Sequence, residues 1–457
     1  MITPQSVVDI VLGEAAKNRR ADETIVVVTD KVEATLRWAN NSMTTNGVAV
    51  SRTVTVISIV RRGDGASVGS VVSGEADPSV LPGLVVSSQD AARAAPEAGD
   101  AAPLIGGDGV PADWDAPVPG TGVGVFSGIA GRLSGRLRRA EKLYGYAHHS
   151  LSTTFLASST GLRRRHTQPT GGIEINVKRG DASAWAGAGT ADFADVRIDS
   201  LFSDLEIRLD WASRTFELPA GRYETILPPS AVADLMLYLA WTMGGRGAHE
   251  GRTALAAPAG GTRVGERLTD LPLTLFSDPM APGLACTPFV AAGNSSETVS
   301  VFDNGMDIGR VDWIRGGVIN ALAYPRAAAA RFDAPVAVGC DNLVMTGGAA
   351  ELADMIAFTE RGLLLNTLWY IREVDPTTLL LTGLTRDGVY LIEDGEVVGA
   401  VNNFRFNESP LDLLRRATEA GLSEKTLPRE WGDWCTRAMM PTLRVSDFHM
   451  SSVSQAK

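Results

Sequence analysis

Two stretches of this 457-residue sequence repeat one another, and the repeat constrains how the first half of the chain can fold. The pattern VRRGD at residues 60–64 returns conservatively as VKRGD at residues 177–181. Each copy reads as a strand, a polar turn, a returning strand, a basic Arg-Gly-Asp turn and a Gly/Ala-rich strand. A helix candidate follows each copy, at residues 87–95 and 200–212. A repeated unit predicts two related βαβ-like halves that build one N-terminal α+β domain.

Local signals near the N-terminus predict a helix and then a hairpin. Thr3 followed by Pro4 is typical of a helix cap with proline in the first turn. Asn46-Gly47 separates two segments rich in β-branched residues, 35–45 and 48–60. Because both turn residues tolerate positive φ, they predict the turn of a β-hairpin.

The chain is long enough for two domains of ordinary size. We expect an N-terminal α+β domain at residues 1–220 and a C-terminal β-rich domain at residues 221–457. Residues 91–120 are dominated by Ala, Pro, Gly and Asp, a composition that predicts a loose linker between the two halves of the first domain. The expected fold class is α+β.

Beyond residue 220, short apolar runs are broken by pairs of glycines, a pattern that favours short strands and turns. Asp394-Gly395 lies between apolar runs and predicts a hairpin turn. Helices are expected at the apolar run 235–241 and at residues 410–420, which begin with proline and are followed by glycine. The C-terminal domain should therefore be mainly β, as a curved or barrel-like sheet.

Charge and cysteine content exclude several classes of function. Lys and Arg number 42 against 53 Asp and Glu, a net charge of −11, so the chain repels phosphate backbones and nucleic acid is not an expected partner. Cys286, Cys340 and Cys435 are few and far apart, which indicates neither a disulfide framework nor a zinc ribbon and fits a reducing cytoplasm. The apolar run 235–241 is too short for a membrane span, and no targeting segment is recognised, so no membrane partner is expected.

Catalytic motifs are weak. Gly65-Ala66-Ser67-Val68-Gly69 matches the G-x-S-x-G serine elbow, but it lies in a strand-to-strand turn, and the repeat has Ala184 where the first copy has Ser67. The five histidines are too few and too scattered for a zinc helix, since none stands four or five residues from another; they are His148, His149, His166, His249 and His449. Glu250 follows His249, but no second imidazole lies one turn further along.

Residues 362–414 closely resemble the C-terminal half of the TldD/PmbA (TldE) family of peptidase subunits. Further blocks similar to the family extend the resemblance over nearly the whole chain; they lie at residues 158–163, 168–171, 261–266, 271–275 and 441–452. In active subunits of that family, a His-Glu-x-x-x-His helix holds zinc because two imidazoles one turn apart share a helical face. That helix lies roughly twenty residues before the block matched by residues 263–266.

The resemblance implies a TldE-like subunit without the zinc motif. The position of the zinc helix falls near residues 241–246, a stretch that contains no usual zinc ligand and no glutamate to act as base. The family has a further cysteine ligand in the region of Cys435, but the spacing from Cys435 to Pro441 is shorter than the family pattern. We therefore expect no catalytic residue, metal ligand or cofactor in this chain, and zinc in a TldD-like partner.

Such pairs are associated with cleavage or processing of small or unfolded peptides, so an extended peptide is the expected second partner. The chain could form a homodimer when alone. Two alternatives stay open: an autonomous hydrolase that uses His249, Glu250 and Cys435, and a peptide-binding or assembly module outside proteolysis. Candidate contacts with peptide or partner, which could equally support turns and packing, are Arg263, Glu266, Asn304, Arg310 and Trp369.

Overall fold

The repeated sequence forms the same arrangement of strands twice. The computed structural model describes residues 2–107, 109–139 and 141–455. The elements of the first half are α1 (Pro4–Asn18), β1 (Glu23–Ala39), β2 (Ser42–Arg62), β3 (Gly65–Ser73), α2 (Leu81–Ala94), η1 (Val123–Phe126), α3 (Ser127–Arg136), β4 (Lys142–Ser158), β5 (Arg163–Arg179), β6 (Ala182–Thr190) and α4 (Ile198–Trp211). Gly63 and Gly180 make equivalent turns, with φ of 60° and 61°, in the two copies.

The six strands form one antiparallel sheet in the order β3-β2-β1-β4-β5-β6, with β1 and β4 paired at its centre. Each half is therefore three consecutive antiparallel strands followed by a helix, α2 or α4. The helices agree with the prediction, but the βαβ-like description was wrong, because neighbouring strands join through tight turns that require antiparallel pairing.

The first hairpin turn lies at Asn40-Asn41 and not at Asn46-Gly47. Both asparagines are left-handed, with φ of 48° and 63°. The Asn41 amide donates to the carbonyls of Arg139 and Glu141, and its oxygen accepts the N–H of Leu143. Asn46 instead lies opposite Leu36 within the ladder. Contacts with a segment a hundred residues away thus fix a turn that local propensity placed elsewhere.

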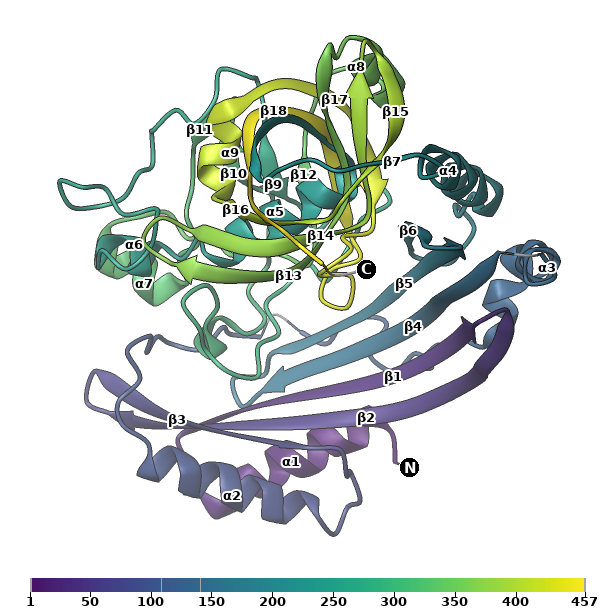
Figure 1. Ribbon diagram of the computed structural model, residues 1–457. Coiled ribbons are helices and arrows are strands. Elements are labelled where there is room, and N and C mark those ends of the chain that lie inside the picture. The colour runs from purple at the N-terminus through teal and green to yellow at the C-terminus, as the bar shows by residue number, and fades with distance from the viewer. Residues whose placement is uncertain (1, 108, 140, 456–457) are drawn as a thin grey trace.

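The first sheet has a core on each face, as the period of two along a strand requires. Val26 and Val28 of β1 pack with α1 and α2, whereas Ile25 and Val27 pack against residues near η2 in the C-terminal half. Helices α1 and α2 cover the lower face of the sheet in Figure 1, and the C-terminal half lies over the upper face. Thr3 caps α1 by accepting the N–H of Ser6, as predicted.

The segment 95–122 contains no helix or strand among its described residues apart from a single bridge at Glu97, yet it is packed. Trp114 is buried with its ring edge-on to Phe155 at 5.4 Å, and the Gln5 amide donates to the Trp114 carbonyl. One buried aromatic anchors a segment that its composition predicts to be loose.

The C-terminal half forms a second, 12-stranded sheet that curls around a helix (Figure 1). Its elements are β7 (Thr215–Phe216), β8 (Gly221–Leu227), α5 (Pro229–Trp241), α6 (Gly245–His249), β9 (Leu275–Ser277), η2 (Val301–Asp303), β10 (Val311–Arg315), β11 (Val318–Ile319), α7 (Arg326–Phe332), β12 (Leu343–Met345), α8 (Leu352–Ala357), β13 (Arg361–Asp375), β14 (Leu380–Glu393), β15 (Glu396–Val401), β16 (Phe404–Glu408), α9 (Pro410–Arg416), β17 (Ala417–Thr426) and β18 (Ala438–Val453). The α+β class and the mainly β, curved C-terminal sheet are confirmed. The boundary at residue 220 stays a prediction, and β7 before it pairs with β15.

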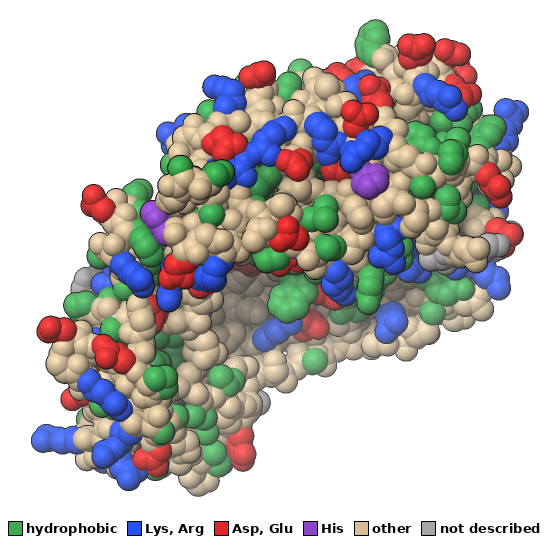
Figure 2. All heavy atoms as spheres, turned by 60° about the vertical axis from the view of Figure 1, so that its left-hand side comes forward, with side chains coloured by type: hydrophobic (Ala, Val, Ile, Leu, Met, Phe, Trp, Pro, Cys, Tyr) green, Lys and Arg blue, Asp and Glu red, His purple; other side chains and the backbone are tan. Residues whose placement is uncertain are grey.

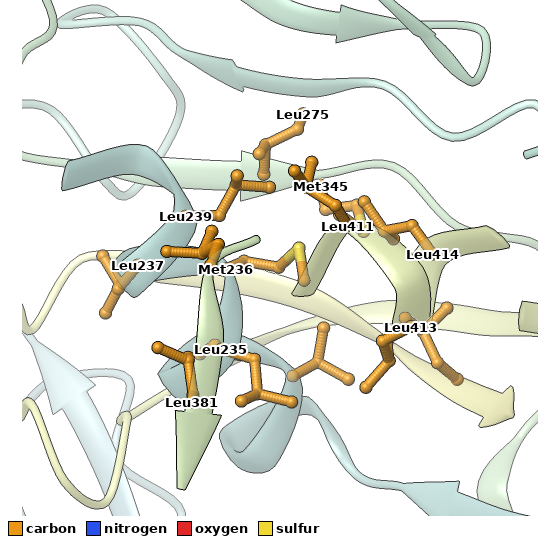
Figure 3. Close-up of a cluster of buried hydrophobic side chains, with 14 of the residues drawn as sticks. Leu235, Met236, Leu237, Leu239, Leu275, Met345, Leu381, Leu411, Leu413 and Leu414 are labelled. Carbon is orange, nitrogen blue, oxygen red and sulfur yellow. The ribbon is translucent and has the colours of Figure 1, made fainter. Parts of the chain in front are cut away.

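Helix α5 is the centre of the C-terminal core. Figure 3 shows Leu235, Met236 and Leu239 of α5 among leucines from β9, β14 and α9. The Asp394-Gly395 turn between β14 and β15 is confirmed, with φ of 50° and 82°. The second predicted helix is shorter than expected, because Ala417 leaves α9 and pairs with Val445 in the sheet. In the described chain, no helix has the length and apolar character needed to cross a membrane.

Candidate functional site

Three cavities adjoin one another: two lie between the first sheet and the C-terminal half, where Figure 2 shows the surface hollowed, and one lies within the C-terminal half. We call the first, of about 390 Å³, the polar cavity, and the second, of about 540 Å³, the aromatic cavity. The third, of about 280 Å³, lies along the end of β5 and β6. All three touch one segment, residues 428–437, which we call the strap.

The floor of the polar cavity is one face of the first sheet. Alternate residues of β1 and β4 line it: Lys31, Glu33, Tyr146, His148, Ser150 and Ser152. The sheet pairs Lys31 with Ser152 and Glu33 with Ser150, so these polar side chains stand in adjacent rows. Burial lowers the pKa of His148, which keeps the imidazole neutral near pH 7. The floor therefore offers hydroxyls and a neutral ring beside a Lys31–Glu33 ion pair.

Arg437 ties the strap to both halves of the molecule. Its guanidinium donates to Asp341 at 2.5 Å, to the Pro169 carbonyl at 2.8 Å and to the Thr170 hydroxyl. Arg437 is buried, and it lines both the polar and the third cavity. A planar fork with several donors suits this position, because it can bind two chain segments at once.

A buried carboxyl on α5 holds the other part of the strap. Asp234 accepts the N–H groups of Glu430 at 3.0 Å and Trp431 at 3.4 Å, and its second oxygen has no hydrogen-bond partner. Complete burial raises the pKa of Asp234 well above its usual value, against the smaller effect of these hydrogen bonds. Glu430 in turn accepts the N–H groups of Tyr370 and Ile371 on β13.

Arg429 lies between two tryptophans where the sheets meet. Its guanidinium is 5.4 Å from the Trp185 ring on β6 and 4.7 Å from the Trp369 ring on β13, and it pairs with Glu174 of β5 at 2.8 Å. Contacts of three consecutive strap residues, Arg429, Glu430 and Trp431, thus hold the strap in place just before the residues that line the cavities.

The aromatic cavity is walled mainly by apolar side chains, among them Trp241, Trp313, Trp434, Leu237, Val338 and Leu343. Trp313 is buried and donates its indole N–H to Ser277 at 3.1 Å, which fixes the ring plane. Trp434 is 74% exposed and also lines the polar cavity. The aromatic cavity therefore opens beside the polar one.

The fold brings together cysteines that are distant in sequence. Cys340 and Cys435 both line the aromatic cavity, and Cys286 hydrogen bonds Cys340, an interaction that lowers the pKa of Cys286 and raises that of Cys340. Burial raises the pKa of Cys435 to about 12, so this thiol stays protonated and is a poor nucleophile. Among the described residues, no group of three or more His, Cys, Asp or Glu is arranged to hold a metal ion.

A fourth cavity, the edge groove, runs between two strand edges and measures about 680 Å³. Residues 185–189 of β6 line one side, and Leu422, Glu424, Lys425 and Thr426 of β17 line the other. Strand β6 is the last strand of the first sheet, and β17 pairs with β18 on one side and bridges Ala350 through Gly421 on the other. Lys425 pairs with Asp195 at 3.1 Å across this region.

The five predicted contact residues do not gather at one site, although Arg263 and Glu266 contact each other. Arg263 and Glu266 form a two-pronged ion pair at 2.6 Å, and Arg263 also donates to the Ala254 carbonyl. Asn304 is buried and bonds both backbone groups of Ala292. Arg310 lies 3.7 Å from the centre of the Phe276 ring. These four stabilise loops, and of the five only Trp369 contacts the strap; their role in binding peptide or a partner stays a prediction.

The residues considered for an autonomous hydrolase contact separate surroundings. His249 stacks on Phe332 with ring centres 4.3 Å apart, and Glu250 forms ion pairs with Arg246 and Arg252. Cys435 lies in the strap. The segment 241–246, which leads from α5 to α6, supplies no zinc-ligating side chain. The described residues of this segment therefore offer no side chain of the kind that holds zinc.

The sequence analysis named Cys435 of the strap and its neighbour Trp369, but missed the other strap residues and their partners. Asp341 and Arg437 are 96 positions apart, and neither lies in a recognisable motif. The one available signal was composition, since residues 429–437 contain two tryptophans and two arginines within nine positions.

Comparison with known proteins agrees with this architecture. Residues 220–452 match the family model for the PmbA/TldA metallopeptidase C-terminal domain. No curated protein sequence gives a significant match. TldE from Thermococcus kodakarensis has the same fold, with a TM-score of 0.78 at 16% identity over 97% of this chain and 99% of that one.

Two further solved structures are similar over the full length. A proposed modulator of DNA gyrase from Bacteroides thetaiotaomicron gives a TM-score of 0.75 at 14% identity, covering 99% of this chain and 100% of that one. A second, from Thermotoga maritima, gives 0.73 at 14% identity, covering 98% and 100%. On the family match across more than half of its length, the chain belongs to the PmbA/TldD (TldE) family of metallopeptidase-related proteins.

Proposed function

We propose that this chain is a TldE-like subunit that binds extended peptides and pairs with a zinc-bearing TldD-like subunit, which cleaves or processes small or unfolded peptides. The observation that carries the proposal is the series of cavities between the two sheets, bordered by the edges of β6 and β17. A strand edge presents main-chain donors and acceptors that an extended peptide can pair with, whatever its sequence.

The edge of β6 is partly engaged within this chain, so a peptide would pair with its remaining main-chain groups. The Trp185 carbonyl accepts from the side chains of Arg208 at 2.7 Å and Asn366 at 3.3 Å, so at least this edge group points away from β5. Gly187 and Gly189 follow at the same alternate spacing. Glycine in a strand allows another backbone to come close, and at Gly189 that backbone is the strap, since the Thr436 carbonyl lies where a Cβ would stand.

Chemistry is assigned to the partner because the chain lacks the paired imidazoles of the family zinc helix. The thiol of Cys435 is protonated at neutral pH, and Glu250 is held by two arginines, which lowers its pKa to about 2. Neither group is suited to general-base work near pH 7.

The test uses the purified chain, a TldD-like subunit and their mixture, with an unfolded peptide and a folded protein as substrates. The chain alone should bind the peptide without cleaving it, and the mixture should cleave the peptide faster than the TldD-like subunit alone. The same peptide with N-methylated backbone amides should bind weakly, because it cannot pair with a strand edge. Metal-dependent cleavage by the chain alone, abolished by substitutions in this chain, would contradict the proposal.

A further inference from the structure

We propose that the aromatic cavity is a subsite that takes a large apolar side chain of the bound peptide. This inference rests on the proposed function and adds a side-chain preference to it. Binding through the main chain alone would accept any sequence, so a preference must come from a side-chain pocket next to the peptide path.

The walls of the aromatic cavity suit an aromatic or branched aliphatic group. Trp313 presents a ring fixed by Ser277, and Trp241 packs against Trp431 with ring centres 5.0 Å apart and the rings nearly perpendicular. Leu237 of α5 and Leu343 of β12 supply aliphatic surface. The volume of about 540 Å³ lies within the range of about 300–1,000 Å³ that is typical of small-ligand pockets.

Charge argues against a cationic side chain as occupant. Asp341 is the one carboxylate among the described lining residues, and its ion pair with Arg437 at 2.5 Å already neutralises it. Tryptophans with a free carboxylate would favour an ammonium group, but here the carboxylate is engaged. An anionic side chain would face a mainly apolar wall and would lose hydration without compensation.

The position of the aromatic cavity, next to the polar cavity, also suits a subsite for a peptide side chain. Asp341 and Trp434 line both the polar and the aromatic cavity, so the two adjoin at these residues. A peptide backbone above the polar floor, near Ser150 and Ser152, could therefore direct one side chain past Trp434 into the aromatic cavity. Trp434, at 74% exposure, would lose solvent contact when a side chain enters.

The experiment measures binding of four capped decapeptides of Gly and Ser to the full chain by calorimetry. The peptides differ only at the central position, which is Phe, Leu, Lys or Gly. Filling an apolar pocket favours the correct group by about 10- to 200-fold, so the Phe and Leu peptides should bind at least about tenfold more tightly than the Gly peptide.

The Ala240→Phe variant fills the cavity from α5, and it should reduce affinity for the Phe peptide to that for the Gly peptide while leaving the Gly peptide unchanged. Val336→Phe, at an exposed position that does not line the cavity, is the matched control. If Ala240→Phe fails to fold, Trp434→Ala serves instead, because this exposed ring is not part of the core. It should weaken binding of the Phe peptide several-fold more than binding of the Gly peptide.

The outcomes separate the two proposals. Equal affinity for all four peptides would overturn the subsite while supporting main-chain binding, and tightest binding of the Lys peptide would likewise overturn it. A Phe preference that survives both cavity variants would place the apolar contact elsewhere and overturn the assignment. Failure of every peptide to bind would overturn the proposed function, and the subsite with it.

Discussion

Arg437 and Asp341 form a 2.5 Å ion pair at the boundary between the polar and aromatic cavities. The two side chains are unequal, since the Arg437 side chain is 8% exposed and that of Asp341 is 58% exposed. Arg437 also binds the Pro169 carbonyl and the Thr170 hydroxyl, both on β5. Arg437 therefore links the strap to the first sheet, and its pair with Asp341 lies where the polar and aromatic cavities meet.

Substitution of Arg437 should cost more stability than substitution of Asp341. Arg437→Met removes charge-assisted hydrogen bonds and should lower the free energy of unfolding by about 2–3 kcal/mol. Asp341→Asn keeps an acceptor at a solvent-reachable position and should cost under about 1 kcal/mol. Urea unfolding of both variants measures the difference. Equal losses would show that Arg437 acts only through Asp341, contrary to its contacts with β5.

The Asp234→Asn substitution should change how stability depends on pH. Burial raises the pKa of Asp234 well above the usual 3.8, so the folded state holds a proton that the unfolded chain has released. The contribution of Asp234 is therefore present below about pH 4 and is lost as pH rises toward the folded pKa. The asparagine side chain has no proton to release in this pH range, and its oxygen can still accept the N–H groups of Glu430 and Trp431.

Guanidinium unfolding at pH 4.5, 6 and 7.5 checks this expectation. The stability of the variant relative to wild type should increase with pH. A difference that stays constant across the three pH values would mean that Asp234 is ionised in the folded protein. Asp412→Asn, on the exposed face of α9, is a control that should show no such trend.

The turn at Asn40-Asn41 predicts unequal effects of two asparagine substitutions. Asn41→Ala removes three hydrogen bonds to residues 139–143 and places alanine at φ 63°, so it should cost about 2–4 kcal/mol. Asn46→Ala lies at an exposed ladder position and should stay within about 0.5 kcal/mol of wild type. Thermal unfolding measures the stability of both variants. A larger loss of stability for Asn46→Ala would favour the turn at Asn46-Gly47 that the sequence predicted.

Arg429 should couple the two sheets through its planar stacking. Arg429→Lys keeps the charge but loses the fork and the flat contact with Trp185 and Trp369. Hydrogen exchange should therefore become faster at residues 185–189 of β6 and near Trp369 of β13, with α1 unchanged. Unaltered exchange along β6 would show that the edge groove holds its shape without this contact.

The sequence predicted those features that local chemistry decides. The Thr3 cap, the Asp394-Gly395 turn and the apolar helix at 235–241 each depend on neighbours in the chain. Long-range pairing overrode local propensity elsewhere. A helix was expected to continue past residue 416, but Ala417 begins β17 and pairs with β18. The repeat correctly indicated two equivalent halves with returning strands, but the βαβ-like label was wrong, because all neighbouring strands in each half pair antiparallel.

Much less of the candidate site was predictable. The family resemblance drew attention to Cys435, which lines the aromatic cavity, but to no other residue of the strap, because the cavities form where segments distant in sequence pack together. Asp341, Trp313 and Cys340 become neighbours of the strap only through that packing. Asp234 reads as one polar position within an apolar helix, and its burial depends on the backbone of residues 430–431 above it. Such contacts leave no local pattern in a single sequence.

Photo-crosslinking to the isolated chain tests most directly whether the cavities along the strap and the edge groove bind extended peptides. An unfolded peptide with a photoreactive group at its centre is irradiated with the full chain, and the adducts are mapped by mass spectrometry. Saturable adducts are expected on the strap, on residues 185–189 of β6 and on β17, and they should be competed by unlabelled peptide and weakened by backbone N-methylation. Adducts confined to α1 and α2, on the opposite face of the first sheet, would contradict it.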